Sequence, residues 1–411
     1  MIMDNMVPEI RFKEFSGEWV ENNLGELIDI RSAARVHKKQ WTDTGVPFFR
    51  TSDVVSIYKG EENTKAYISH EIYQELSEKI GRVTRDDLLI TGGGSIGIPY
   101  LVPNDNPLYF KDADLLWLKN NKKCNGYFLY TFFFSETFKK HIKSISHTGT
   151  IAHYTIEQAK ATPINTCNDE EQTQIGNYFQ KLDTFINQHQ QKHNKLSNIK
   201  KAMLEKMFAK QDETIPEIRF KGFSGEWKMK ELSEIGSFSS GVGFSESEQS
   251  GKSGIPFFKV SDMNLMGNDC YMTSANNYVN EEQILRLNYT PIRENSILFA
   301  KVGAAIFLER KRIAKDFLID NNMMAFSPTQ DIIFMKQWFD SISLSKHTQV
   351  GALPSLKASD LGKIKIRIPK REEQIKIGNY FQKLDALINQ HQQQITKLNN
   401  IKQACLSKMF V

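Results

Sequence analysis

Two Ser-Asp pairs are the residues best placed to form a catalytic group that occurs twice in this sequence. Ser52-Asp53 and Ser261-Asp262 each begin three positions after the end of a Pro-Phe-Phe run with the composition of a core strand. Side chains of this kind after a strand are typical of turn caps. We therefore expect the pairs to be structural, and no other acidic or nucleophilic constellation recurs.

Two glycine motifs resemble phosphate-binding loops without matching them. Gly251-Lys252-Ser253 could end a P-loop, but Glu246 stands where that motif needs its first glycine. Gly92-Gly93-Gly94 is no dinucleotide fingerprint, and its counterpart at 302–304 keeps one glycine, so a tight turn is the better explanation. Since the chain also lacks the Pro-Pro of an amino-methyltransferase motif, we predict no catalytic residue and no cofactor.

Metal chemistry is not supported either. The four cysteines are far apart and form no C-x-x-C pair, which favours reduced thiols in a cytoplasmic protein. His189 and His391 occupy equivalent positions of two helical segments, but no carboxylate or cysteine stands near them in sequence. We prefer a polar position that sets helix register over a metal site.

Charge and hydropathy narrow the class of partner. No apolar run reaches 18 residues, so no membrane association is expected. The net charge is +5, and regions 1–165 and 216–370 carry net charges of only −1 and +3. DNA binding would therefore depend on local clusters, each of which could instead be a solvated face. The candidate DNA contacts are Lys38, Lys39, Arg50, Arg82, Arg85, Lys122, Lys123, Lys259, Arg293, Lys301, Arg310 and Arg312.

An internal repeat organises the whole chain. Residues 8–19 and 216–227 match at 11 of 12 positions, and residues 170–208 and 372–410 match at 28 of 39. The regions between these blocks have diverged, with fragments such as 88–97 and 297–306 still comparable. Either surface loops have drifted, or two modules bind different things on a common frame.

Each copy ends in a predicted long helix. A seven-residue period runs over five heptads, apolar at most of its positions and polar in the middle, which is the pattern of a coiled coil. Thirty-nine residues would span roughly 58 Å. The predicted seam includes Leu182, His189, Leu196, Leu384, His391 and Leu398.

The segments before the helices predict mixed α/β modules. Strands are expected at 46–49, 87–91, 115–118, 255–259, 296–300 and 363–368, and helices at 69–79 and 126–143. The predicted boundaries are 1–165 and 216–370 for the modules, and 166–210 and 371–411 for the helices.

With these blocks in view, the sequence resembles the DNA specificity subunits of type I restriction–modification systems. The resemblance rests on the P-x-I-R-F-x-x-F-x-G-x-W opening, the G-[VI]-P-F-F-[RK]-x-S-D block and the E-E-Q-x-x-I-G-x-Y-F-x-x-L-D helix, each present twice. It implies an α/β (α+β) fold with two target recognition domains separated by an antiparallel coiled coil of two spacer helices, related by a pseudo-two-fold repeat.

The resemblance also implies partners. Each domain would read half of a split site on double-stranded DNA, and the helices would bind two modification (methyltransferase) subunits, with restriction (endonuclease/translocase) subunits completing the complex. The chain itself would not be an enzyme. A coiled-coil scaffold without DNA readout is the main alternative, and an enzyme with an unrecognised site is a third.

Overall fold

The computed structural model describes residues 6–112, 114–145, 153–210, 212–249, 251–349 and 353–411. The chain forms two compact units. Unit 1 comprises Met1–Gln190 with Gln393–Val411, and unit 2 comprises Gln191–Gln392. Each unit therefore contains one predicted module together with part of both long helices.

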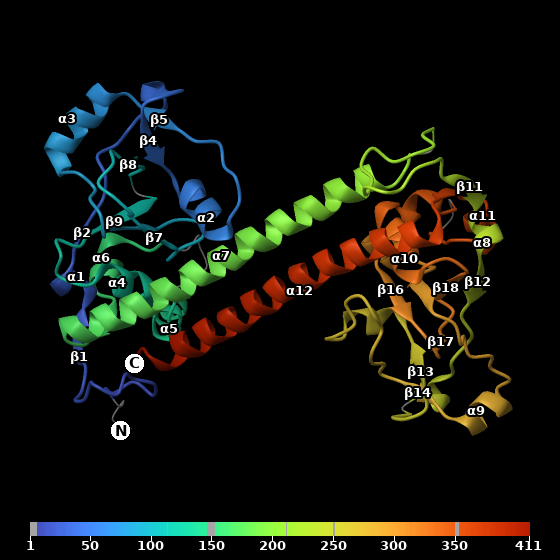
Figure 1. Cartoon of the computed structure of the whole chain (residues 1–411). Coiled ribbons are helices and arrows are strands. Elements are labelled where there is room, and N and C mark those ends of the chain that lie inside the picture. The colour runs from blue at the N-terminus through green and yellow to red at the C-terminus, as the bar shows by residue number, and fades with distance from the viewer. Residues whose placement is uncertain (1–5, 113, 146–152, 211, 250, 350–352) are drawn as a thin grey trace. The chain divides into compact units, whose positions relative to one another are not determined.

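Unit 1 is built on two small sheets (Figure 1). An antiparallel sheet has the order β2 (Asp29–Arg31), β9 (Leu115–Lys119), β6 (Leu88–Thr91) and β7 (Pro99–Leu101). The other has the order β3 (Trp41–Thr42), β5 (Tyr67–Ile68), β4 (Val46–Phe49) and β8 (Tyr109–Phe110), with β4 and β8 parallel. A separate ribbon pairs β1 (Val20–Asn23) with β10 (Pro163–Thr166).

Unit 2 has nearly the same topology. Its antiparallel sheet has the order β12 (Gly236–Ser240), β18 (Met323–Pro328), β15 (Ser296–Ala300) and β16 (Lys311–Ala314). Its second sheet has the order β14 (Tyr278–Val279), β13 (Ile255–Phe258) and β17 (Leu318–Ile319), and its ribbon pairs β11 (Lys228–Glu231) with β19 (Lys365–Ile368). The diverged middles thus keep one architecture.

Short helices complete both units. Unit 1 contains α1 (Leu24–Leu27), η1 (Lys38–Gln40), α2 (Thr51–Lys59), α3 (His70–Ile80), α4 (Gly126–Phe132), α5 (Glu136–Ile145) and α6 (Ile156–Lys160). Unit 2 contains α8 (Leu232–Ile235), η2 (Glu246–Glu248), η3 (Val260–Asn264), α9 (Glu281–Arg286), η4 (Ala304–Leu308), α10 (Ile332–Ser341), η5 (Leu344–His347) and α11 (Ala358–Gly362).

The two long helices are α7 (Asp169–Met207) and α12 (Arg371–Lys408). Within each unit they run antiparallel, and one hydrophobic cluster joins them. Leu182 and Leu398 belong to the cluster of unit 1, whereas Leu384 and Leu196 belong to that of unit 2. His189 and His391 are half-buried on α7 and α12.

Most predicted elements occur where the residue patterns place them, including β4 at 46–49 and β15 at 296–300. The single helix expected over 126–143 is wrong, because α4 ends at Phe132 and α5 starts at Glu136. The break lies where the Ser135 hydroxyl accepts a hydrogen bond from the Phe138 amide, 3.2 Å away. A serine at this position begins a new helix rather than continuing the old one.

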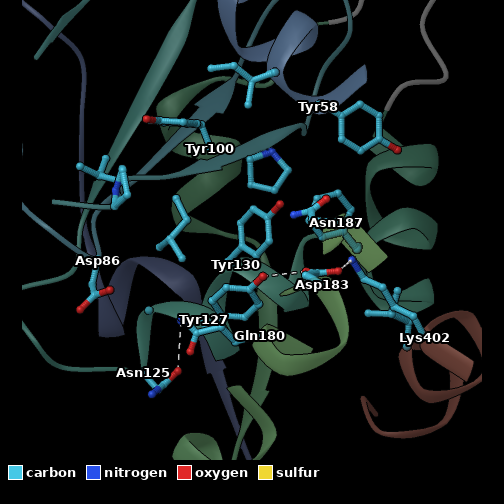
Figure 2. A pocket seen from close by; sticks show the side chains of 18 of the residues that line it. Tyr58, Asp86, Tyr100, Asn125, Tyr127, Tyr130, Gln180, Asp183, Asn187 and Lys402 are labelled. Carbon is cyan, nitrogen blue, oxygen red and sulfur yellow. Dashed lines mark hydrogen bonds and ion pairs between the residues drawn. The ribbon is translucent and has the colours of Figure 1, made fainter. Parts of the chain in front are cut away.

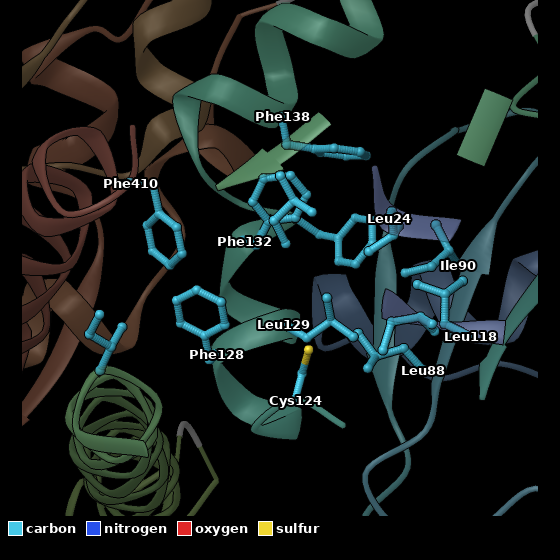
Figure 3. Packing of buried hydrophobic residues seen from close by; sticks show 14 of the residues in the cluster. Leu24, Leu88, Ile90, Leu118, Cys124, Phe128, Leu129, Phe132, Phe138 and Phe410 are labelled. Carbon is cyan, nitrogen blue, oxygen red and sulfur yellow. The ribbon is translucent and has the colours of Figure 1, made fainter. Parts of the chain in front are cut away.

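Aromatic side chains dominate the core that joins domain and helices in unit 1 (Figure 3). Phe410, just beyond α12, packs on Phe128 and Phe132 of α4, with ring centroids 5.4 and 6.4 Å apart. Leu88, Ile90 and other sheet residues pack behind α4 in the same cluster. The far C-terminal end of the sequence thus completes the core of the N-terminal domain.

No helix in the described part of the chain is long and apolar enough to cross a membrane.

Candidate nucleic-acid interface

A buried arginine–glutamate pair fastens the opening motif of each copy to its long helix. Arg11 binds Glu171 through two hydrogen bonds of 2.7 Å, and Arg219 binds Glu373 in the same way. The glutamates are 0% and 1% exposed. Each arginine also donates to two carbonyls of its own loop, at residues 16 and 17 or 224 and 225. This clamp explains why the two repeated blocks occur together.

The same opening motifs bind the C-terminal ends of the long helices. The Ile218 amide donates to the Lys206 carbonyl, 2.9 Å away, and the Ile10 amide donates to the Lys408 carbonyl, 3.0 Å away. Helix ends leave carbonyl groups without partners, and these amides satisfy one at each end. The Ile218–Lys206 contact is local in sequence, whereas the Ile10–Lys408 contact joins residues near opposite ends of the sequence. In a pseudo-two-fold repeat, each opening motif is expected to make the same contact with the end of a long helix.

A glutamine and a glycine repeated in both long helices contact the start of a short helix in each domain. Gln172 and Gln374 accept hydrogen bonds from the backbone amides of Asn125 and Asp331, which begin α4 and α10. One turn later, Gly176 and Gly378 lie against these same residues. The space is unequal, because a Cβ at Gly176 would meet Asn125 Oδ1 at 2.2 Å, whereas one at Gly378 would meet Asp331 Oδ1 at 3.1 Å.

This inequality predicts different effects of one substitution. Alanine in a helix interior is favoured over glycine by about 1 kcal/mol. Gly378→Ala should therefore change the free energy of unfolding by less than about 1 kcal/mol. Gly176→Ala should lower it by about 2 kcal/mol, since Asn125 and α4 must shift. Urea unfolding of both variants checks this, and equal effects would contradict it.

Two ion pairs between the long helices escaped the sequence analysis. Asp183 of α7 binds Lys402 of α12 in unit 1, and Lys200 of α7 binds Asp385 of α12 at 2.6 Å in unit 2. The signal was present, because both copies carry an Asp and a Lys that stand 17 positions apart. Each aspartate pairs with the lysine of the other copy, so the pairs fix an antiparallel register.

A tyrosine-rich cavity of about 770 Å³ lies between the domain and the helices of unit 1 (Figure 2). Tyr127 donates to Asp183 Oδ2 at 2.7 Å, and Lys402 binds the other carboxylate oxygen. Burial raises the pKa of Tyr127 and Tyr130, and the nearby Asp183 charge adds to the effect. This network links α4 to both long helices within unit 1.

The aspartates of the two Ser-Asp pairs act as caps, the role that the sequence pattern predicted for the pairs. Asp53 accepts hydrogen bonds from the Arg50 backbone amide and from Asn63, at 2.9 and 2.8 Å. Asp262 accepts from the Lys259 amide at 2.8 Å and from Asn276 at 2.6 Å. Both carboxylates are buried and cap the start of α2 or η3. Among the described residues, no group of three or more His, Cys, Asp or Glu could hold a metal ion.

In unit 2, three candidate DNA contacts gather at one end of the antiparallel sheet. Lys301 follows β15 and Arg310 precedes β16, so both lie at the tip of this hairpin. Lys259 follows β13 beside the β17–β18 turn, whose Asn322 carbonyl accepts from the Lys301 amide. Arg293 lies at the opposite end of the hairpin, 3.4 Å from Asp316.

In unit 1, the candidate DNA contacts lie in other places. Arg82, Arg85, Lys122 and Lys123 are exposed at the end of the sheet where β6 begins and β9 ends. That end lies away from the β6–β7 tip, and Arg85 lines the cavity beside α7. Lys38 and Lys39 are exposed on η1, apart from both groups.

Several of the candidates also make contacts within the fold. Lys259 donates to Gln249 and lies over the Phe244 ring, and Arg310 donates to Asn264. The Arg50 guanidinium binds Asp53 and lies over the Trp41 ring, 5.7 Å from its centroid. Arg312 donates to the Asn268 carbonyl at 2.6 Å, and burial lowers the pKa of its guanidinium. Charge alone does not distinguish such residues from those that face solvent.

The β15–β16 tip is anchored by Glu309. Its carboxylate accepts from the Ser343 hydroxyl and from the backbone amides of Leu344 and Ser345, at 2.6–3.0 Å, and binds Lys311 at 2.7 Å. Burial opposes its ionisation, but these donors outweigh burial and lower the pKa of Glu309 to about 2.

This lowered pKa predicts a pH dependence. The folded state holds the ionised form more firmly than the unfolded state does, so the stabilisation is full above about pH 4.5 and is lost as the pH falls toward 2. Glu309→Gln should lower the free energy of unfolding by about 1–2 kcal/mol near neutral pH. Urea titrations at several pH values should show the difference from wild type shrinking below pH 4.5, and a difference that grows there would contradict the assignment.

Comparison with known proteins also divides the chain into two similar halves. The sequence profile of the type I restriction modification DNA specificity domain matches residues 16–198 and again 224–400. A Haemophilus influenzae protein named as a type I restriction enzyme specificity subunit is 28% identical over 167 residues, which cover 40% of each chain. The MjaIX type I restriction enzyme specificity subunit of Methanocaldococcus jannaschii is 24% identical over 418 residues, covering 94% of this chain and 90% of that protein.

Solved structures share the fold. The S subunit of a type I restriction–modification system from M. genitalium superposes with a TM-score of 0.64 at 17% identity, covering 99% of both chains. A chain from a structure describing complex assembly and conformational transition of the type I R-M system has a TM-score of 0.51 at 16% identity, covering 94% of this chain and 96% of that one. Because the profile matches most of the sequence in two tandem copies, the chain belongs to the family of type I restriction–modification DNA specificity subunits.

Proposed function

We propose that this chain gives a type I restriction–modification complex its DNA sequence specificity without catalysing a reaction itself. Residues 1–165 and 216–370 would each bind one half of a bipartite, asymmetric duplex site. Spacer helices at 166–210 and 371–411 would bind two modification subunits, which methylate adenine, and restriction subunits would join the same complex. An adenine must leave the base stack to be methylated, and the modification subunit would supply that pocket.

One observation carries this proposal. The two units repeat the same clamp and the same strand order, yet the residues at their hairpin tips differ in size and charge. A scaffold needs the common frame but has no use for two diverged domains on it. Two different readers held by one frame would recognise two different half-sites.

Methylation mapping tests the function directly. The chain would be expressed with its modification subunits in a host without DNA methylation, and modified adenines would be located by single-molecule sequencing. We expect one new motif with two short half-sites around a fixed gap. Stable co-purification with an active modification subunit but no new motif would favour the scaffold alternative.

Within unit 2, the tip end of the sheet is our choice for the phosphate contacts. Lys301→Ala and Arg310→Ala should each weaken binding to all duplex sequences alike. Each should also make the slope of log K against log salt less negative by about 1, as expected for one lost phosphate contact. Arg293→Ala is the matched control, because Arg293 lies at the opposite end and faces Asp316.

Fluorescence anisotropy with the intact complex at several salt concentrations measures these slopes. An effect of Arg293→Ala equal to that of the other two variants would move the interface to the other end of the sheet. No change in slope for any of the three would remove this sheet from the interface.

A further inference from the structure

The tip of the β15–β16 hairpin exposes two large apolar side chains. Phe307 and Leu308, in η4, are 57% and 56% exposed. The preceding residue, Ile306, is buried in the core of unit 2, so η4 holds one side chain inward and two outward. Exposed apolar surface of this kind commonly marks a binding site.

This tip is held in one conformation. Gly303 and Glu309 bracket η4 with positive φ angles of 80° and 50°, which are costly for a glutamate. The Gly303 amide donates to the Pro354 carbonyl at 2.8 Å, and the Glu309 carboxylate binds η5 through three donors. A strained residue fixed by several hydrogen bonds is typical of a pre-organised functional loop.

Basic residues stand on the elements next to the apolar pair. Lys301 and Arg310 lie at the base of the tip on either strand. Lys346 and His347 are exposed on η5, which packs against η4. The one carboxylate within the tip, that of Glu309, faces η5 and Lys311. An apolar pair with lysine and arginine residues on the neighbouring elements is complementary to duplex DNA, whose phosphates flank an apolar base stack.

The corresponding tip of unit 1 has different chemistry. Residues 92–98, between β6 and β7, are four glycines, one serine and two isoleucines. Both isoleucines are half-buried and pack against cores of unit 1, while Gly94 and Ser95 are exposed. Thr91 closes this turn by accepting from the Ile98 amide at 2.9 Å. The same position of the fold is small and polar in one unit and large and apolar in the other.

We propose that Phe307 and Leu308 form an apolar wedge that contacts bases in the half-site read by the domain at 216–370. The inference rests on the proposed function. It adds that the two half-sites are read in different ways, because the domain at 1–165 has no such wedge on its tip. Apolar side chains of this kind can pack on thymine methyl groups or enter between base pairs.

The experiment uses the intact complex of this chain with its modification subunits. Once the wild-type methylation motif is known, binding is measured on the cognate duplex and on duplexes with each single base pair replaced. We expect the double variant Phe307→Ala/Leu308→Ala to bind the cognate duplex about 10- to 100-fold more weakly. Discrimination should be relaxed at one or two adjacent base pairs of one half-site and unchanged in the other.

Leu285→Ala is the matched control, because Leu285 is 82% exposed in the same unit but stands on α9 beside Glu281 and Glu282. It should bind as wild type does. Unchanged binding of the double variant, or equal loss at both half-sites, would overturn the wedge while leaving the specificity function intact. Absence of any wild-type motif would instead refute the proposed function, so the two failures are distinguishable. Thermal unfolding of the double variant confirms that the fold is retained.

Discussion

Phe410→Ala is expected to destabilise unit 1 by about 3–5 kcal/mol, although the residue is almost four hundred positions away from the start of the domain it supports. The Phe410 side chain is buried beside Phe128, whose ring centroid lies 5.4 Å away (Figure 3). The ring centroids of Trp19 and Phe179 each lie 6.2 Å from that of Phe410. Alanine leaves a cavity among rings on α4, α7 and the opening motif. These elements cannot all close on it, since the clamp between Arg11 and Glu171 fixes the position of the opening motif on α7.

Hydrogen–deuterium exchange with mass spectrometry locates this effect. Peptides covering α4 should exchange faster in Phe410→Ala, while peptides covering α10 should not change. Phe208→Ala is the matched control, because Phe208 follows α7 in the same motif and packs on Phe334 and Phe381 of unit 2. It should give the reverse pattern. Faster exchange in both units for either variant would contradict two separately packed cores.

The frame of this protein was predictable because the sequence contains it twice. The closely matching blocks at 8–19 and 216–227 and in the long helices indicated a common scaffold before any contact was known. In the structure, several of the residues shared by the two copies make defined contacts, such as the ion pair of Arg219 with Glu373 and the packing of Gly378 against the start of α10. What the repeat could not reveal was which copy contacts which. Asp183 and Lys200 belong to one copy, yet each pairs with the other copy.

The candidate interface was less predictable for a physical reason. A lysine or arginine in a loop can face DNA, bind a neighbouring carbonyl or cover an aromatic ring, and composition is the same in all three cases. Arg312 binds a carbonyl and Arg50 covers an aromatic ring, whereas Lys301 and Arg310 gather at a tip that only strand pairing defines. The apolar pair at 307–308 stood in a diverged region, where exposure cannot be read from hydrophobic pattern alone.

Arg219→Ala should produce an equally large loss in unit 2. Removing one partner of a buried ion pair typically costs about 3–5 kcal/mol, because the remaining charge stays in a site without water. Here Glu373 would keep its buried position without its cation, and the loop at 216–227 would lose its bonds to the Ser224 and Gly225 carbonyls. Urea unfolding followed by the fluorescence of Trp227, which is buried in that loop, reports the change. A loss below 1 kcal/mol would contradict the clamp.

The variant Glu373→Gln separates two contributions to this loss, the missing hydrogen bonds and the cost of leaving a buried carboxylate without its cation. It leaves Arg219 at the edge of the site, where that side chain is partly exposed and keeps its two carbonyl partners, so the loss should be smaller than for Arg219→Ala. The double variant removes the buried charge together with its cation. It should therefore be more stable than Arg219→Ala alone, and the two single effects should not add. Simple additivity would mean that the pair contributes only packing, and the two repeated blocks would then need another reason to occur together.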